Sequence, residues 1–394
     1  MKRTYENELT INADGTISHD DCIDHCLLYA FGECGESHSL RCQGYQEHFE
    51  LFEFMKSYVG ADEFSQYAEI RDRLQYFLAH QARKVYLNAQ FKAALNQLDE
   101  DGAVIIADYK MRVLPQSARE TKEAFFGKRG WTLHTILVFI KKSGKNKLIV
   151  RAYDHWSTDT KQDAWFTASS FEAVFETIRK KPKWIRILSD NGPHYHNSQL
   201  MAIVSHWFEW YNIRVLGWQF LEPGEAKTTI DSHHASVSKY KARLCYFFTN
   251  TNFTQIAHAI KRYVRIGFDI AEGNDIIKAG QNLAGTSFAN IEPDRGQMGE
   301  ENAGKKAPVK TIPGISKYYY WEWPTEGPLA GYICARPLPH VGSWENYSPA
   351  AVANLCNTEI VRPKPSFSEH TENLIDWEMQ MPRMSGRSNY EGSL

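Results

Sequence analysis

The stretch KWIRILSDNGPHYHNSQL (residues 183–200) indicates the fold class of this chain of 394 residues. Its first eight residues are rich in large apolar side chains and end on Asp190, which predicts a buried strand with an acid at its end. The Asn191-Gly192 pair predicts a tight turn, and a helix is expected from about Gln199. A buried strand followed by a turn and a helix is typical of α/β domains.

The neighbouring sequence continues this pattern. AVIIADY (103–109) is a short apolar run that closes on Asp108 and predicts a strand. WTLHTILVFIKK (131–142) and KLIVRAYDHW (147–156) flank a turn and predict a hairpin, while IRVLGWQF (213–220) predicts a last strand. Helices are expected around 171–178, after Gln199 and over about 228–248. The order strand, strand, strand, helix, strand, helix, strand, helix predicts an α/β fold.

The acids at the strand ends are the first candidates for chemistry. Open α/β sheets place their sites beyond the carboxyl ends of the strands, where Asp108 and Asp190 are expected. Two neighbouring carboxylates favour Mg²⁺ or Mn²⁺, and a third acid would complete a site for two ions roughly 3.5–4 Å apart. Glu222, Glu225 and Asp231 are the candidates, and Asp231 is the best placed because it lies in the first turn of a predicted helix. An aspartate after a strand is also commonly a simple cap.

These segments carry a resemblance. SDNGPHYHNSQL (189–200) and EPGEAKTTIDSHHASVSKYKARL (222–244) resemble the catalytic core of DDE/D transposases and retroviral-type integrases. ADYKMRVLPQSARETKEAFFGKRGWTLHT (107–135) is similar to a segment of mobile-element-derived eukaryotic proteins. The resemblance implies an RNase H-like mixed five-stranded sheet flanked by helices. It also implies that Asp108, Asp190 and Asp231 are catalytic residues that bind two Mg²⁺ or Mn²⁺ ions and cut or join DNA.

Two departures keep other functions open. The third acid is an aspartate rather than the commoner glutamate, with Glu225 as the alternative, and no basic tail or DNA-binding module accompanies the core. A catalytically inactive, domesticated interaction module is one alternative, and an RNase H-fold nuclease acting on RNA or hybrid duplexes is another. A transposase normally holds two DNA ends, so a homodimer or larger oligomer is expected if the first hypothesis holds.

Basic and histidine side chains cluster around the predicted site. Those after the first strand are Lys110, Arg112, Arg119, Lys122, Lys128 and Arg129, and those on the acid-bearing helix are Lys239, Lys241 and Arg243. They are candidates for phosphate contacts, although a solvated loop explains them equally well. Four histidines are expected at the same mouth: His194, His196, His233 and His234. One of them could be a proton shuttle or a lone metal ligand, whereas surface residues or partners of the ligands are the alternative.

Cysteines and histidines crowd the N-terminal region, where four of the chain's 7 cysteines lie. One structural Zn²⁺ bound by Cys34, His38, Cys42 and His48 is predicted, since these four residues follow one another at plausible steps. No C-x-x-C pair exists, and Cys22-x3-Cys26 also suits a buried amphipathic helix. Ordinary buried thiols are therefore the alternative.

Composition and charge set the wider limits. The chain is 43% hydrophobic with a net charge of −2, and it lacks an apolar run of about 18 residues, so no membrane span is expected. The first residues lack the apolar core of a secretory signal, which predicts an intracellular protein, and the resemblance implies a nuclear one. The tyrosines and tryptophans of SKYYYWEWP (316–324) suit a β core better than base stacking. The predicted organisation is a Cys/His segment (1–60), a helical region (61–102), the core (103–265), a flexible linker (271–315), a small aromatic β module (316–360) and a disordered tail (361–394).

Overall fold

The computed structural model describes residues 9–60, 63–117, 128–222, 229–234, 255–296, 309–373 and 375–382. Two compact units divide them. The N-terminal unit comprises the described parts of residues 1–97, 336–344 and 382, and the core unit comprises those of 98–335 and 345–381. No described helix is long and apolar enough to cross a membrane.

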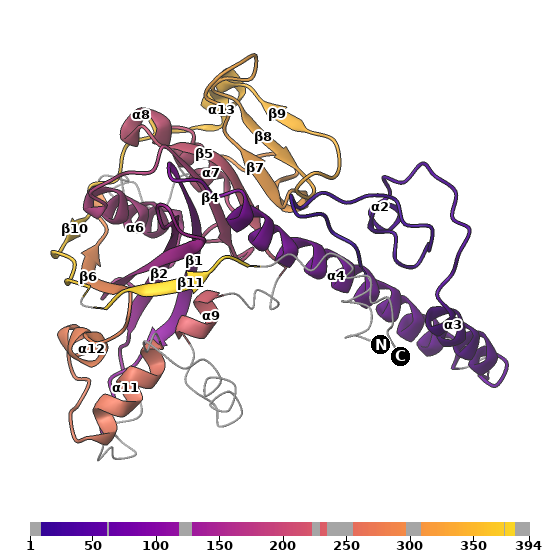
Figure 1. Ribbon diagram of the computed structural model, residues 1–394, viewed down its shortest axis with the longest axis horizontal. Coiled ribbons are helices and arrows are strands. Elements are labelled where there is room, and N and C mark those ends of the chain that lie inside the picture. The colour runs from indigo at the N-terminus through magenta and orange to yellow at the C-terminus, as the bar shows by residue number, and fades with distance from the viewer. Residues whose placement is uncertain are drawn as a thin grey trace. The chain divides into compact units, whose positions relative to one another are not determined.

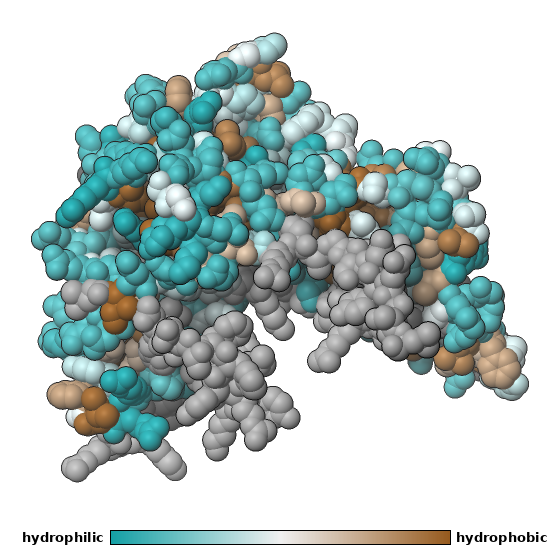
Figure 2. Space-filling model, in the orientation of Figure 1, coloured by the Kyte–Doolittle hydropathy of each residue, from teal (hydrophilic) through white to brown (hydrophobic). Residues whose placement is uncertain are grey.

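The N-terminal unit is built on one long helix. Its helices are α2 (Leu27–Ala30), α3 (Gln43–Lys56) and α4 (Phe64–Asn96). The chain on both sides of α2 packs along the second half of α4. Before α2, the Gly15 carbonyl accepts from the Gln90 amide at 2.7 Å, and directly after α2, Phe31 lies against Tyr86. The helix expected within 61–102 is thus confirmed as a single element. Figure 2 shows hydrophobic side chains at the surface around α3, where Phe54 and Tyr58 are exposed.

The core unit contains one mixed sheet of eleven strands among the described residues, in the order β10-β6-β3-β2-β1-β4-β5-β7-β8-β9, with β11 also paired to β3 (Figure 1). The first five strands are β1 (Gly102–Val113), β2 (Trp131–Lys141), β3 (Lys147–Ser157), β4 (Trp184–Ser189) and β5 (Arg214–Phe220). The remaining six are β6 (Thr286–Glu292), β7 (Tyr320–Glu322), β8 (Ile333–Arg336), β9 (Glu345–Tyr347), β10 (Ser366–Phe367) and β11 (Trp377–Gln380).

The five predicted strands form the centre of this sheet. β2 pairs antiparallel with both β1 and β3. β4 pairs parallel with β1, and β5 pairs parallel with β4. The predicted hairpin is therefore confirmed. Its turn contains Gly144 at φ +67°, a backbone conformation that glycine adopts without steric strain. The chain has an α/β fold.

Helices lie on this sheet at both faces. They are α6 (Ala164–Thr177), α7 (Ser198–Val204), α8 (Trp207–Tyr211), α9 (Thr229–His234), α11 (Ile256–Arg265), α12 (Gly273–Gly280) and α13 (Pro349–Leu355), with a 3₁₀ turn at Ile315–Lys317. Side chains of α6, α7 and α8 share a core with Ile105 and Ile187 of the sheet. α11 and α12 pack instead with Leu133 and Trp156.

Local capping explains where the helices begin. The Asp163 carboxylate accepts from the Phe166 amide at 2.9 Å and starts α6, and Asn197 does the same for α7 through the Leu200 amide at 2.8 Å. The helix expected around 171–178 begins earlier, because Ser169 and Ser170 already lie buried inside α6.

The sheet extends further than the sequence predicted. Five strands were expected, together with a separate aromatic module over 316–360, but β7 pairs with β5 at Trp218↔Trp321 and continues the same sheet (Figure 1). The aromatic side chains of this segment are part of the common core because Trp321 is fully buried in it.

The predicted linker and tail are likewise corrected where the structure describes them. Residues 271–315 include α12 and the strand β6, which pairs parallel with β3. The predicted tail includes β10 on β6 and β11 on β3. The Arg362 guanidinium holds this returning chain to α6 through Glu172 at 2.7 Å and Glu176 at 2.6 Å.

Candidate functional site

Asp108 and Asp190 occupy neighbouring positions in the middle of the core-unit sheet. Asp190 directly follows β4, as predicted, whereas Asp108 lies within β1, which continues to Val113 and does not end at the acid. β1 and β4 are adjacent parallel strands in which Ala107 is paired with Ser189, so the next residue of each chain is an aspartate. Neighbouring strands are about 4.8 Å apart, so the backbones of the two aspartates are adjacent. Their side chains are 25% and 37% exposed, so solvent reaches both.

Each of these aspartates contacts a histidine. His234 Nδ1 lies 3.3 Å from Asp108 Oδ2, and His194 Nε2 lies 3.3 Å from Asp190 Oδ1. Burial alone would raise the pKa of Asp190, but the contact with His194 and a hydrogen bond from the Gly192 amide hold it below its ordinary value. Asp190 is therefore an anion at neutral pH.

The short helix α9 is fixed to the sheet by a buried polar cluster. His233 Nε2 lies 2.9 Å from Asp154 Oδ2, and both side chains are fully buried. The Thr135 hydroxyl donates to the same carboxylate and contacts His234 Nε2 at 2.8 Å. Burial opposes the charge on Asp154, yet His233 and Thr135 hold its pKa below the ordinary value. Since Thr135 pairs with both Asp108 and Asp154 across the ladders, these contacts place α9 next to Asp108.

Lys110 adds a further contact to α9. Its ammonium group donates to the His234 carbonyl at 2.6 Å, at the last described residue of the helix. Burial lowers the pKa of Lys110, and the carboxylates of Asp108 and Asp154 oppose that effect. Lys110 of β1 therefore links the sheet to α9 beside Asp108.

A second set of histidines lies on the face of the sheet that is covered by α6. Tyr109 stacks on His134 at 4.1 Å, and His134 Nε2 meets the Tyr195 hydroxyl at 2.8 Å. Ser170 contacts both His134 and His155, and His155 Nε2 lies 2.8 Å from His370 Nε2. Burial keeps the pKa of His134 and His155 well below the ordinary value, so both rings are neutral.

Tyr195 joins this network to the site. Burial raises its pKa well above the ordinary value, and the charges of Asp108 and Asp190 raise it further. Its hydroxyl therefore stays protonated and keeps its contact with His134.

The remaining predicted site residues fall into three groups. Asp231 is on α9, one turn before His234, and is exposed, and Glu222 is buried just after β5. Arg112 and Arg129 are exposed, whereas the Lys128 ammonium donates to the Pro115 carbonyl at 2.7 Å. The predicted residues Arg119, Lys122, Glu225, Lys239, Lys241 and Arg243 lie outside the described residues.

The histidines predicted at the mouth are all close to the strand ends. His194 and His234 contact the two aspartates, and His233 contacts Asp154. His196 stacks on Phe220 at 4.2 Å and contacts the Asn191 side chain, so it orders the loop after β4.

Asp154 and Thr135 are functional candidates that the sequence analysis missed. The available signal was an acid inside the otherwise apolar strand KLIVRAYDHW, because an unpaired charge is rarely buried. Its partner His233 is far away in sequence, and only the docking of α9 reveals the pair.

The N-terminal unit holds a separate group of potential metal ligands. One donor atom each of His19, Cys26, Cys34 and His38 lies within 4.8 Å of the others, a set that could bind a metal such as zinc. Cys34 and His38 were predicted ligands. Cys42, also predicted, is outside this group and precedes α3, where its amide donates to Asp24 at 2.9 Å. The side chain of His48 lies outside the described residues.

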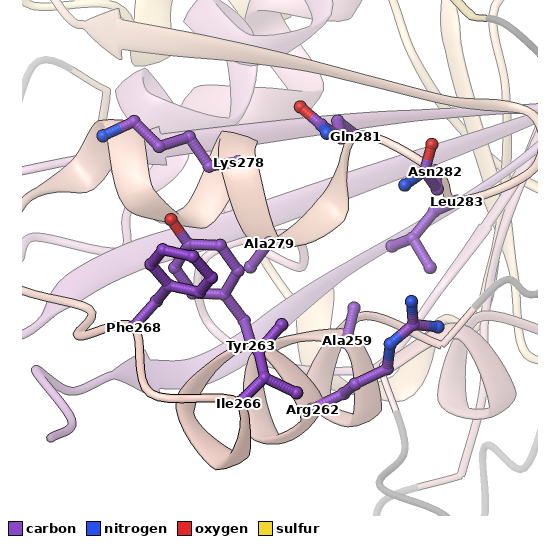
Figure 3. A pocket seen from close by; sticks show the side chains of 10 residues that line it. All are labelled: Ala259, Arg262, Tyr263, Ile266, Phe268, Lys278, Ala279, Gln281, Asn282 and Leu283. Carbon is purple, nitrogen blue, oxygen red and sulfur yellow. The ribbon is translucent and has the colours of Figure 1, made fainter. Parts of the chain in front are cut away.

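A surface pocket of about 490 Å³ is found between α11 and α12 of the core unit (Figure 3). Tyr263 and Phe268 stack at 4.8 Å along one side, and Arg262 and Lys278 approach the opening. Lys278 is paired with Asp275 at 2.9 Å. None of the predicted site residues lines this pocket, which is therefore separate from the carboxylate site.

The donor atoms at the carboxylate site suit a hard divalent cation. Two partly exposed aspartates offer carboxylate oxygens at neighbouring positions of β1 and the residue after β4, and Mg²⁺ or Mn²⁺ prefers such ligands. Among the described side chains, the imidazoles of His194 and His234 add nitrogen atoms that contact these carboxylates.

Comparison with known proteins assigns no function to this arrangement. Residues 88–266 match the family model described as a domain of unknown function, DUF8701. No match was found among curated proteins. The matched segment runs from the last turns of α4 to the end of α11 and contains Asp108, Asp154, Asp190 and α9, so this chain is similar to that family over the whole candidate site.

Proposed function

We propose that the core unit is a metal-dependent phosphoryltransferase of the transposase or integrase type that acts on DNA. The observation that carries the proposal is the register of the adjacent parallel strands β1 and β4, in which Ala107 pairs with Ser189 directly before Asp108 and Asp190. The central order β3-β2-β1-β4-β5, antiparallel in its first half and parallel in its second, supports an RNase H-like core.

In this proposal the two aspartates are the principal ligands of Mg²⁺ or Mn²⁺. Bound there, the ions would supply Lewis-acid stabilisation of a phosphoryl group and lower the pKa of an attacking water. Asp190, kept anionic by His194, and Asp108, beside His234, hold negative charge at neighbouring positions of the fold. Of the basic residues predicted to contact phosphates, Arg112 and Arg129 are exposed and so are available to a nucleic-acid backbone.

The third ligand comes from α9 in this proposal. The helix offers two side chains: Asp231, the acid expected from the sequence, and His234, which contacts Asp108 at 3.3 Å. The contact favours His234. Mn²⁺ binding measured by electron paramagnetic resonance separates the two, because loss of affinity in His234→Ala but not in Asp231→Ala identifies the imidazole, and the reverse identifies the carboxylate.

The activity test is cleavage of duplex DNA by the full chain with Mg²⁺ or Mn²⁺. Asp108→Asn and Asp190→Asn are expected to lose cleavage by at least ~100-fold, since each removes a ligand charge at the reacting centre. Asp269→Asn is the matched control, because Asp269 is an exposed acid of the same unit. Full activity in both site variants would refute the assignment.

The same assay weighs the alternatives. Cleavage confined to RNA or to hybrid duplexes would favour an RNase H-type nuclease. Absence of cleavage of any of the three substrates, together with absence of metal binding, would favour a non-catalytic interaction module.

A further inference from the structure

The residues between 16 and 42 have almost no hydrophobic core of their own. Only Cys22, Cys26 and Leu27 are buried in this segment. Its regular structure is the four-residue helix α2 and one isolated bridge between Cys22 and Leu40. So short a segment needs a cross-link or a metal to hold a single conformation.

The four donors found there have the chemistry and the spacing for one ion. His19 Nδ1 lies 3.3 Å from Cys34 Sγ, and Cys34 Sγ lies 3.9 Å from His38 Nε2. A tetrahedral zinc site with Zn–S near 2.3 Å and Zn–N near 2.0 Å places its ligand atoms about 3.5 Å apart. The observed distances, all within 4.8 Å, need only a small contraction to reach that geometry.

Neighbouring groups orient these ligands. His19 presents its other nitrogen, Nε2, to Asp21 Oδ1 at 3.5 Å, and a carboxylate behind a histidine is a common partner in metal sites. The Tyr29 amide donates to Cys26 Sγ at 3.4 Å, which stabilises negative charge on that sulfur. The His19 and His38 rings lie 4.8 Å apart at an interplanar angle of 49°, so both can turn a nitrogen toward the same point.

We propose that His19, Cys26, Cys34 and His38 bind one structural Zn²⁺ that folds the segment 16–42. His19 binds through Nδ1 and His38 through Nε2, and the two thiolates complete a closed tetrahedral set with no open position for a substrate. The ion links the chain before α2 to the turn after it, and so replaces the missing hydrophobic core. This site is independent of the function proposed for the core unit.

The test is the metal content and metal spectrum of the full chain, purified under reducing conditions. Wild-type protein and the matched control Cys42→Ser are expected to carry one zinc per chain by elemental analysis. Cys34→Ser and His19→Ala are expected to retain less than a third of it.

A second measurement does not depend on whether the variants fold. X-ray absorption at the zinc edge of the wild-type chain is expected to show two sulfur and two nitrogen ligands. A metal-free wild-type chain, a Cys26–Cys34 disulfide in the reduced preparation, or loss of zinc in Cys42→Ser but not in Cys34→Ser would overturn the proposal.

Discussion

Replacing His233 with alanine tests how α9 is held to the sheet. Asp154 and His233 are both fully buried and lie 2.9 Å apart, so the change leaves a buried carboxylate with Thr135 as its remaining described partner. Removing one member of a buried ion pair costs about 3–5 kcal/mol. The free energy of unfolding of the core unit is therefore expected to fall by about 3 kcal/mol or more.

Urea denaturation followed by tryptophan fluorescence measures this loss, because every tryptophan except Trp344 lies in the core unit. His206→Ala is the control, since His206 is 37% exposed and its acidic partner Glu209 is exposed, and it should change stability by less than about 0.5 kcal/mol. The double variant Asp154→Asn/His233→Ala should recover part of the loss, because it removes the unpaired charge. A loss below about 1 kcal/mol in His233→Ala would refute the reasoning.

Three further outcomes are expected. Burial lowers the pKa of His370 to about 4, below the unfolded value, so folding opposes its protonation. The free energy of unfolding should therefore fall as the pH drops from about 6.5 toward 4, by up to about 1.4 kcal/mol per pH unit. His370→Gln should flatten this slope in acid denaturation, and an unchanged slope would contradict the prediction. Gly102→Ala places a Cβ 2.2 Å from the Trp184 ring and should destabilise the protein by about 1–3 kcal/mol in the urea assay, whereas Gly60→Ala, with open space, should not. Arg295→Ala removes ion pairs to Asp159 at 2.8 Å and Asp163 at 2.6 Å and should lower the thermal midpoint, and an unchanged midpoint would show that these pairs are not stabilising.

The centre of the fold was predictable because its signals are local. The hairpin of β2 and β3 follows from two apolar runs around a short turn, and β4 with its Asn-Gly turn follows from one continuous stretch. The sheet edges were not predictable in the same way. β6, β7 and β11 each become a strand by pairing with a partner distant in sequence, as Trp321 does with Trp218, and β7 and β11 are also short.

The candidate site shows the same division. Asp108 and Asp190 were identified because each follows an apolar run in the sequence, and the parallel register of β1 and β4 makes them neighbours. His234 and Asp154 depend on the position in which α9 docks, which no local pattern specifies. In the N-terminal unit the spacing of Cys34 and His38 selected two members of the cluster, but His19 and Cys26 join it only through the turn after α2.

The most direct test of the central claim is a crystal of the full chain soaked in Mn²⁺ and examined by anomalous scattering. The account predicts a manganese peak about 2.0–2.3 Å from carboxylate oxygens of both Asp108 and Asp190. The peak should vanish in Asp108→Asn crystals of the same form. The absence of a peak between Asp108 and Asp190, with both side chains ordered in the crystal, would contradict the claim.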